Sequence, residues 1–170
     1  ISREGAMSCL FLLDRGKHSL SFSTHPDPSS VIWLDFEMLS LPIKKFGSID
    51  NIPWVELYDH LRTDIKAVKR SLSEFEYDTI VSSGRACLIH SDLVDEGFWK
   101  GKNIFVDVTG VDHMTIKKLK KYNSMFIEAS EDLSARSEIK RAKKKGIHVN
   151  RSPVMPIQSH KINEYIQDFF

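Results

Sequence analysis

The chain has 170 residues, which is enough for one α/β domain with a substantial core. Its hydrophobic share of 41%, charged share of 28% and formal net charge of +1 are ordinary for a globular protein, and they exclude binding of polyanions through bulk charge. No apolar run approaches the ~18 residues that span a bilayer, and no signal peptide is visible. The two cysteines, Cys9 and Cys87, form neither a CxxC pair nor a disulfide framework. We therefore expect a cytoplasmic protein without a membrane segment.

The first 76 residues combine strand-like segments with one long helix. The run CLFLL is followed by the turn-type residues Asp14–Lys17 and then by alternating apolar positions, which predicts a β-hairpin. The apolar segment 31–39 predicts a further strand. Between residues 53 and 73, apolar side chains recur at helical spacing and predict a long amphipathic helix (Trp54, Leu57, Leu61, Ile65, Val68 and Leu72).

From residue 77 onwards, apolar strands alternate with helical patterns. Strands are expected in YDTIVSS, NIFVDV, SMFIEAS and at the start of IHVNRSPVMP. Helices are expected between them and in KINEYIQDFF, while ACLIH fits either a helix or a strand. Such alternation is typical of a parallel sheet covered by helices. We therefore predict an α/β fold with a Rossmann-like, mainly parallel sheet in 77–170. The hairpin and long helix of 1–76 are expected on the same domain, where they either extend that sheet or pack against it.

Small and polar residues follow three of the expected strands, and these strand ends meet at one edge if the sheet is parallel. Ligands of open parallel sheets bind beyond the carboxyl ends of the strands, often at helix N-termini whose free amides favour phosphate. This predicts a nucleotide site, although the same residues also serve to end strands and cap helices. The candidate residues are Ser83, Gly84 and Arg85 after the first strand, Thr109 and Gly110 after the second, and Ser130 after the third.

The segment VDVTGVDHMT resembles the ligand loop of CRISPR-associated Rossmann-fold (CARF) sensor domains, in which a strand ends in Thr-Gly and a methionine follows. The matching positions are Thr109, Gly110 and Met114. The resemblance implies a loop that cradles a cyclic oligoadenylate, and hence a sensor domain that performs no chemistry. The segment 111–113 stands where that family usually has a second glycine and a basic residue.

Residues 77–170 resemble a compact Toll/interleukin-receptor (TIR) domain over a longer stretch. YDTIVSS is similar to its opening strand, and KGKNIFVDV to the strand after its first helix. SMFIEASEDLSARSEIKRAKKKGIHVNRSPV is similar to its next strand, Ser-rich turn, Glu-bearing helix and following strand. The resemblance implies a hydrolase that breaks the bond between nicotinamide and ribose in NAD, with Glu138 as the carboxylate that steadies an oxocarbenium-like ribose. A glutamate in the first turn of a helix is also a standard capping residue.

Two clusters, KKLKK (117–121) and KRAKKKG (140–146), concentrate basic residues late in the chain. They fit solvated helix ends, which are favoured over a surface that contacts phosphate or nucleic acid. The remaining alternative is a non-catalytic interaction domain whose basic helices dock a partner protein. The seven histidines make no metal-ligand spacing with cysteine, and neither Asp107 nor Glu128 belongs to an acid-x-lysine pair of a nuclease core. We therefore expect a nucleotide ligand, no metal, no cofactor, and a homo-oligomer or a partner protein.

Overall fold

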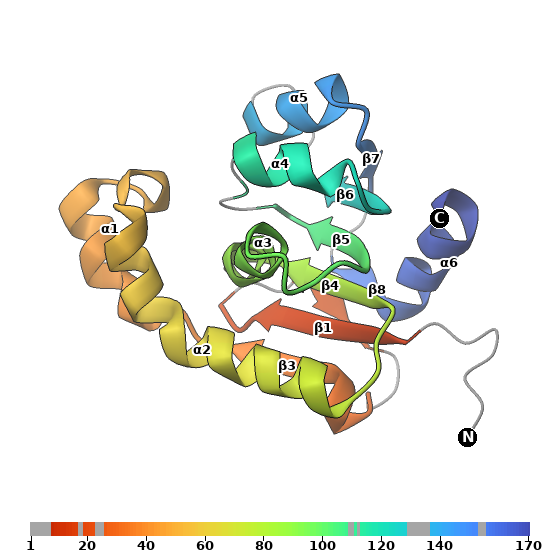
Figure 1. Ribbon diagram of the computed structural model, residues 1–170, viewed down its shortest axis with the longest axis horizontal. Helices are drawn as coiled ribbons and strands as arrows, with labels where there is room; N and C mark the ends of the chain where they lie inside the picture. The colour runs from red at the N-terminus through yellow and green to blue at the C-terminus, as the bar shows by residue number, and fades with distance from the viewer. Residues whose placement is uncertain are drawn as a thin grey trace.

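Six parallel strands form the central sheet of the computed structural model, in the order β3-β1-β4-β5-β6-β7 (Figure 1). The structure describes residues 8–16, 19–22, 26–108, 111, 113–128, 137–152 and 156–170. The strands are β1 (Cys9–Asp14), β3 (Val31–Leu34), β4 (Thr79–Ser83), β5 (Lys102–Val106), β6 (Ser124–Glu128) and β7 (His148–Arg151). In a separate small sheet, β2 (Leu20–Ser21) pairs with β8 (Ile157–Gln158), again in parallel. The predicted α/β fold with a mainly parallel sheet is confirmed.

Within the described residues, five of the six helices lie where the sequence pattern predicts a helix, and the exception is the first, over Ser40–Phe46, where a loop is expected. The helices are α1 (Ser40–Phe46), α2 (Trp54–Glu74), α3 (Cys87–Asp95), α4 (His113–Leu119), α5 (Ser137–Lys144) and α6 (Ser159–Phe169). Short 3-10 turns cover Pro28–Ser30, Glu37–Leu39, Ile49–Asn51 and Gly84–Ala86. The segment ACLIH therefore belongs to the turn and helix after β4. None of the helices in the described ranges is both long and apolar enough to cross a membrane.

Different elements pack on the two faces of the sheet. On one face, α2 and α3 pack over β1 and β4, and α4 and α5 continue this layer over β5 and β6. On the other face, α6 packs through Ile162 and Ile166, together with β2 and β8. Because successive strand residues point to opposite faces, Leu12 contacts the α2 side and Leu13 the α6 side. Figure 1 shows α6 apart from the other helices, and α1 with the start of α2 projecting beyond the arrowhead of β1.

The predicted β-hairpin is wrong. Within the described residues, β1 does not pair with β2; it lies between β3 and β4 and runs parallel to both. The physical reason is burial on both faces, because a central parallel strand carries a near-continuous apolar run and not an alternating one. The strand expected over 31–39 also ends early, at Leu34, where the side chain of Asp35 accepts a hydrogen bond from the amide of Glu37 and starts a turn.

The order of the strands reverses beside β1. From β1 the chain passes to β3 at one side, and then returns through α1 and α2 to β4 at the other side. From β4 it continues outward through β5, β6 and β7. The switch point of this sheet therefore lies between β1 and β4, and an open α/β sheet binds its ligands in the crevice at such a point.

Candidate functional site

The carboxyl ends of neighbouring strands place polar and charged residues along one edge of the sheet. Asp14 ends β1, Arg85 follows β4, Asp107 follows β5 and Glu128 ends β6. The pairings β1–β4, β4–β5 and β5–β6 are all parallel, so these residues lie at the same edge. We call this set of four residues, with Gly16 and Ser19, the carboxyl-edge site.

A two-pronged ion pair between Asp14 and Arg85 spans the switch point. The guanidinium donates from Nε to Oδ2 at 2.7 Å and from Nη2 to Oδ1 at 2.8 Å. The same carboxylate also accepts from the backbone amides of Arg85, at 3.0 Å, and Gly16, at 2.9 Å. Asp14 is fully buried, whereas a quarter of the Arg85 side chain is exposed. The pair thus fixes a guanidinium that still reaches solvent.

The electrostatics of this pair favour its charged form. Burial on its own would raise the pKa of the Asp14 carboxyl, but the hydrogen bonds from Arg85 and from the two backbone amides outweigh burial and hold that pKa below its usual value. The hydrogen bonds from Arg85 to Asp14 in turn raise the pKa of the guanidinium. The guanidinium also lies over the ring of Phe36, 5.3 Å from its centroid. The hydrogen bonds to Asp14 use only part of the N–H donors of the Arg85 guanidinium.

Gly16 leaves the space that the guanidinium occupies. A Cβ atom at this position would lie 2.4 Å from Nη2 of Arg85 and 3.4 Å from Oδ1 of Asp14. Any larger residue at position 16 would therefore push against the ion pair.

Asp107 closes the site on the side of β5. Its φ of 51° lies in the left-handed region, which aspartate adopts more readily than most residues. This turn leads the chain away from β5 and places the Asp107 carboxylate where Oδ2 accepts a hydrogen bond from the Ser19 hydroxyl at 3.2 Å. The Asp107 amide still bonds to the carbonyl of Ile127 at 2.9 Å, so the turn remains joined to β6.

Glu128 has a structural role in this edge. Its side chain is fully buried, and Oε1 accepts a hydrogen bond from the amide of Val108 at 2.8 Å. The carboxylate therefore holds the end of β5 in place.

The predicted site residues have different outcomes. Ser83, Gly84 and Arg85 lie together at the switch point, with the first two buried and the third partly exposed. Two further predicted residues, Met114 and Glu138, belong to α4 and α5, although their side chains lie outside the described part of the structure. Thr109, Gly110 and Ser130 lie wholly outside the described residues.

Sequence reasoning missed the N-terminal half of the site. The sequence pattern predicts a hairpin turn at Asp14 and Gly16 and a second strand after it, because Asp-Arg-Gly-Lys has turn chemistry. The signal that points to the correct assignment is the unbroken apolar run before Asp14, which is typical of a central parallel strand. An acidic residue at the end of such a strand is a candidate for the ligand edge.

A second polar cluster is sealed inside the protein. The Ser82 hydroxyl lies 2.6 Å from Nδ1 of His90, and Nε2 of the same ring lies 2.8 Å from Oδ1 of Asn103. Asn103 Nδ2 donates to the carbonyl of Gly101, so its Oδ1 accepts and the His90 ring carries its proton on Nε2. Burial lowers the pKa of His90 to about 3. This cluster resembles a catalytic relay in composition, but full burial of the ring makes it a structural network.

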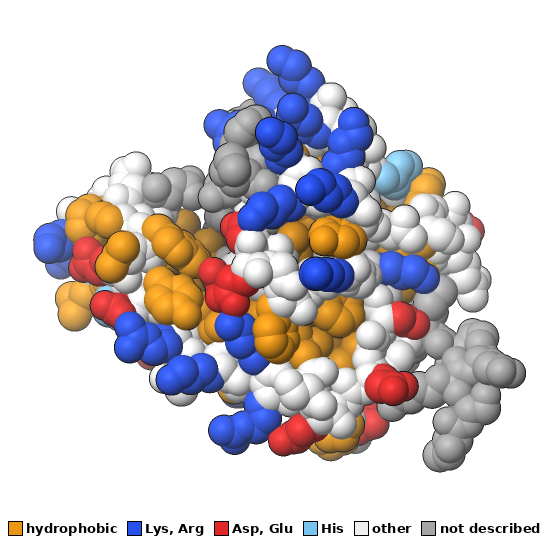
Figure 2. Space-filling model, viewed as in Figure 1, with side chains coloured by type: hydrophobic (Ala, Val, Ile, Leu, Met, Phe, Trp, Pro, Cys, Tyr) orange, Lys and Arg blue, Asp and Glu red, His pale blue; other side chains and the backbone are white. Residues whose placement is uncertain are grey.

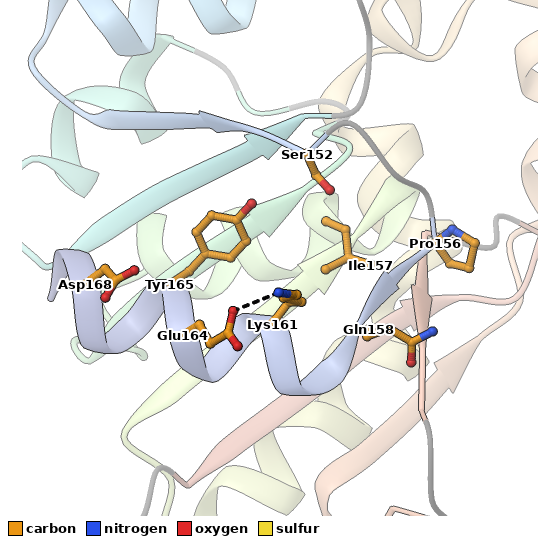
Figure 3. Close-up of a pocket in the computed structure, with 8 residues that line it drawn as sticks. All are labelled: Ser152, Pro156, Ile157, Gln158, Lys161, Glu164, Tyr165 and Asp168. Carbon is orange, nitrogen blue, oxygen red and sulfur yellow. Dashed lines mark ion pairs between the residues drawn. The ribbon is translucent and has the colours of Figure 1, made fainter.

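A surface pocket of about 450 Å³ lies on the α6 side of the sheet (Figure 3). An ion pair of 3.1 Å joins Lys161 and Glu164 at its rim, and the Tyr165 ring lines it. The pocket is lined by Ser152, Pro156, Ile157, Gln158, Lys161, Glu164, Tyr165 and Asp168. Within the described residues, no group of three His, Cys, Asp or Glu side chains is arranged to hold a metal ion.

No family model, no curated protein and no solved structure matches this chain. The geometry of the carboxyl edge is therefore the basis for a functional proposal.

Proposed function

We propose that this protein binds a nucleotide at the carboxyl-edge site, over the switch point between β1 and β4. The observation that carries the proposal is the partly exposed guanidinium of Arg85, which Asp14 holds at that point through two hydrogen bonds. Open α/β sheets bind phosphorylated ligands at the same place in their topology. A guanidinium whose orientation is already fixed loses little entropy on binding a phosphate.

The residues around Arg85 give the ligand an orientation. The Asp14 carboxylate occupies the amide of Arg85 at the start of the turn before α3, so a phosphate meets the guanidinium and not this amide. On the β5 side of this edge, the Asp107 carboxylate already accepts a hydrogen bond from the Ser19 hydroxyl, and a carboxylate is the kind of acceptor that also bonds ribose hydroxyls. Phosphate on Arg85 and ribose beside Asp107 is the pose that we propose.

A more specific form of the proposal is that the protein hydrolyses NAD. Position 138 opens α5, which packs against α4 and precedes β7. In this form, the Glu138 carboxylate stabilises the positive charge that develops on the ribose as the bond to nicotinamide breaks, and water supplies the hydroxyl of the ADP-ribose product.

A binding domain without chemistry is the alternative, and one observation favours it. Val108 and Val111, which flank the predicted residues Thr109 and Gly110 in the sequence, are both buried beyond the end of β5. Two buried residues on either side of a candidate ligand segment suit recognition of a cyclic oligonucleotide.

A thermal-shift panel tests the proposal. The purified chain is melted with NAD, ADP-ribose, mononucleotides and cyclic oligoadenylates, each at a high concentration. A ligand that binds only the folded state adds about 2.7 kcal/mol of stability at a hundredfold over its Kd. A shift with at least one of these ligands is expected, and no shift with any of them contradicts the proposal.

The Glu138→Gln variant then separates the two forms. If the chain is a hydrolase, this variant binds NAD with nearly unchanged affinity and releases no nicotinamide. The matched control is Glu56→Gln, because Glu56 is also an acidic residue in the first turn of a helix. Equal rates of nicotinamide release by both variants would show that Glu138 is not a catalytic residue. In the thermal-shift panel, a shift in melting temperature with cyclic oligonucleotides alone would favour the binding domain without chemistry.

A further inference from the structure

Basic side chains gather on two neighbouring helices far from Arg85 in the sequence. Figure 2 shows a group of Lys and Arg side chains over α4 and α5. The two helices pack side by side, through Ile116 and Leu119 of α4 and Ile139 and Ala142 of α5. We call the exposed basic residues on them and on the turn after α4 the basic surface: Lys117, Lys120, Lys121, Lys140, Arg141, Lys143 and Lys144.

The charge of the chain is strongly segregated. Residues 113–146 contain ten Lys and Arg against four Asp and Glu, a net charge of +6 in a chain whose total is +1. The rest of the chain therefore carries −5. Among the described side chains, Lys118 is the only cation of α4 and α5 that forms an ion pair, with Asp95 at 3.9 Å. The seven residues of the basic surface face solvent without a described acidic partner.

We propose that the basic surface binds the phosphate backbone of a double-stranded nucleic acid. This function is separate from nucleotide binding, since none of the seven residues of the basic surface belongs to the proposed nucleotide site. A surface of solvent-exposed lysine and arginine binds phosphates and releases their condensed counterions, which is a large source of affinity for duplexes. Helices of seven and eight residues are about 10–12 Å long, so two adjacent helices cover several successive phosphates.

The composition of the surface favours a duplex over a single strand. Proteins that hold single strands stack the bases on aromatic side chains. In the described parts of 113–146, Phe126 is buried in the core, and Tyr122 is the other aromatic residue. Lysine is the main residue of the surface and carries its charge on a flexible stem, which suits backbone contact without reading of sequence.

The test is fluorescence anisotropy of the full chain with labelled duplex DNA, duplex RNA and single-stranded DNA of equal length. The association constant K is measured between about 50 and 200 mM salt, where each phosphate contact contributes about −0.9 to the slope of log K against log salt. With about four contacts, log K should fall with log salt at a slope of about −4, and a duplex should bind more tightly than the single strand. Comparison of the affinities for duplex RNA and duplex DNA identifies which of the two nucleic acids the surface binds. Tighter binding of the single strand, or no salt dependence, overturns the proposal.

The triple variant Lys140→Gln/Lys143→Gln/Lys144→Gln should weaken duplex binding by about tenfold or more at 50 mM salt, and the slope should become shallower by about 2. Its matched control is Lys44→Gln/Lys45→Gln/Lys66→Gln, three exposed lysines of α1 and α2. Equal losses in both variants overturn the proposal, as does equally tight binding of polyglutamate. Melting curves verify that both variants fold, and nucleotide binding at the carboxyl-edge site should be the same in both.

Discussion

Arg85 and Asp14 stand 71 positions apart in the sequence, yet the guanidinium of the first bonds the carboxylate of the second through two nitrogen atoms. The contact joins the end of β1 to the turn that follows β4, across the point where the order of the strands reverses. It places a fully buried anion beneath a partly exposed cation. The stability of this edge and the proposed recognition of phosphate therefore depend on the same pair.

The two partners of this pair should contribute unequally to stability. Removing Arg85 leaves a buried carboxylate without its counterion, whereas removing the charge of Asp14 leaves a guanidinium that reaches water. Arg85→Ala should therefore lower the free energy of unfolding by about 3 kcal/mol or more, and Asp14→Asn by less. The double variant should lose less than the sum of the two, by about 1–3 kcal/mol. Urea denaturation of the three variants measures this difference, and strict additivity would show that the two side chains do not interact.

Two buried groups on α3 should give stability opposite dependences on pH. Burial lowers the pKa of His90 from 6.5 to about 3, so between these values only the unfolded chain binds this proton, and stability falls as the pH falls. Burial, aided by a hydrogen bond with Glu96, raises the pKa of Asp92 from 3.8 to about 7. In that interval the folded chain holds the extra proton, so stability falls as the pH rises. Between about pH 4 and 6.5 the two effects oppose each other.

Variants that cannot titrate should expose each effect. In His90→Gln, the free energy of unfolding should fall more steeply with rising pH than in the wild type, by about 1.4 kcal/mol per pH unit in the middle of the interval. In Asp92→Asn, it should rise more steeply with rising pH by a similar amount. Urea denaturation at pH 4.5, 5.25 and 6 provides the slopes. Parallel curves for the two variants and the wild type would mean that neither group titrates as its burial requires.

Gly16→Ala tests whether the ion pair needs the space that glycine leaves. Its methyl group would lie at 2.4 Å from Nη2 of Arg85, so the guanidinium must move and nucleotide affinity should fall by about tenfold or more, the equivalent of 1.4 kcal/mol. Gly146→Ala is the control, because position 146 has a φ of +82° but no atom within 4 Å of an added Cβ. It should cost about 1 kcal/mol of stability and leave affinity unchanged. Equal affinity in both variants would show that the position of Arg85 does not matter for binding.

Substitutions at Asp107 should separate backbone conformation from charge. Asparagine also adopts the left-handed region, so Asp107→Asn should keep nearly full stability while weakening binding of ligands that carry a ribose. Asp107→Val should be less stable than Asp107→Asn by about 1–2 kcal/mol, because a β-branched residue is strained at a φ of 51°. Thermal melting with and without ligand measures both quantities. Equal stability of the two variants would argue against a left-handed conformation at this position.

The sequence supports the fold better than it supports the site, and the reason is physical. Helix α2 follows from local spacing alone, since Leu57, Leu61, Ile65 and Val68 are all buried on one stripe. The parallel strands after residue 77 follow from the alternation of strands and helices in the same way. The position of β1 in the sheet does not follow from local spacing, because Phe11 pairs with both Val31 and Val81 and no local pattern encodes such long-range pairing.

The same limit applies to the residues of the site. Ser83, Gly84 and Arg85 could be predicted because they end a recognisable strand before a helix. The partner of Arg85 could not be predicted, because Asp14 contacts Arg85 only when β1 is paired with β4 in the sheet. Turn chemistry in Asp14–Lys17 favoured a hairpin, and the competing signal was the burial of both faces of the preceding strand.

The central claim is the position of the ligand, and hydrogen exchange measures it most directly. Amide exchange of the full chain is followed by mass spectrometry with and without the nucleotide that raises its melting temperature most. The expected result is slower exchange in peptides that contain Asp14, Arg85 or Asp107, which lie at the carboxyl ends of three neighbouring strands. Slower exchange confined to residues 152–168, around the pocket beside α6, would place the ligand elsewhere and contradict the account.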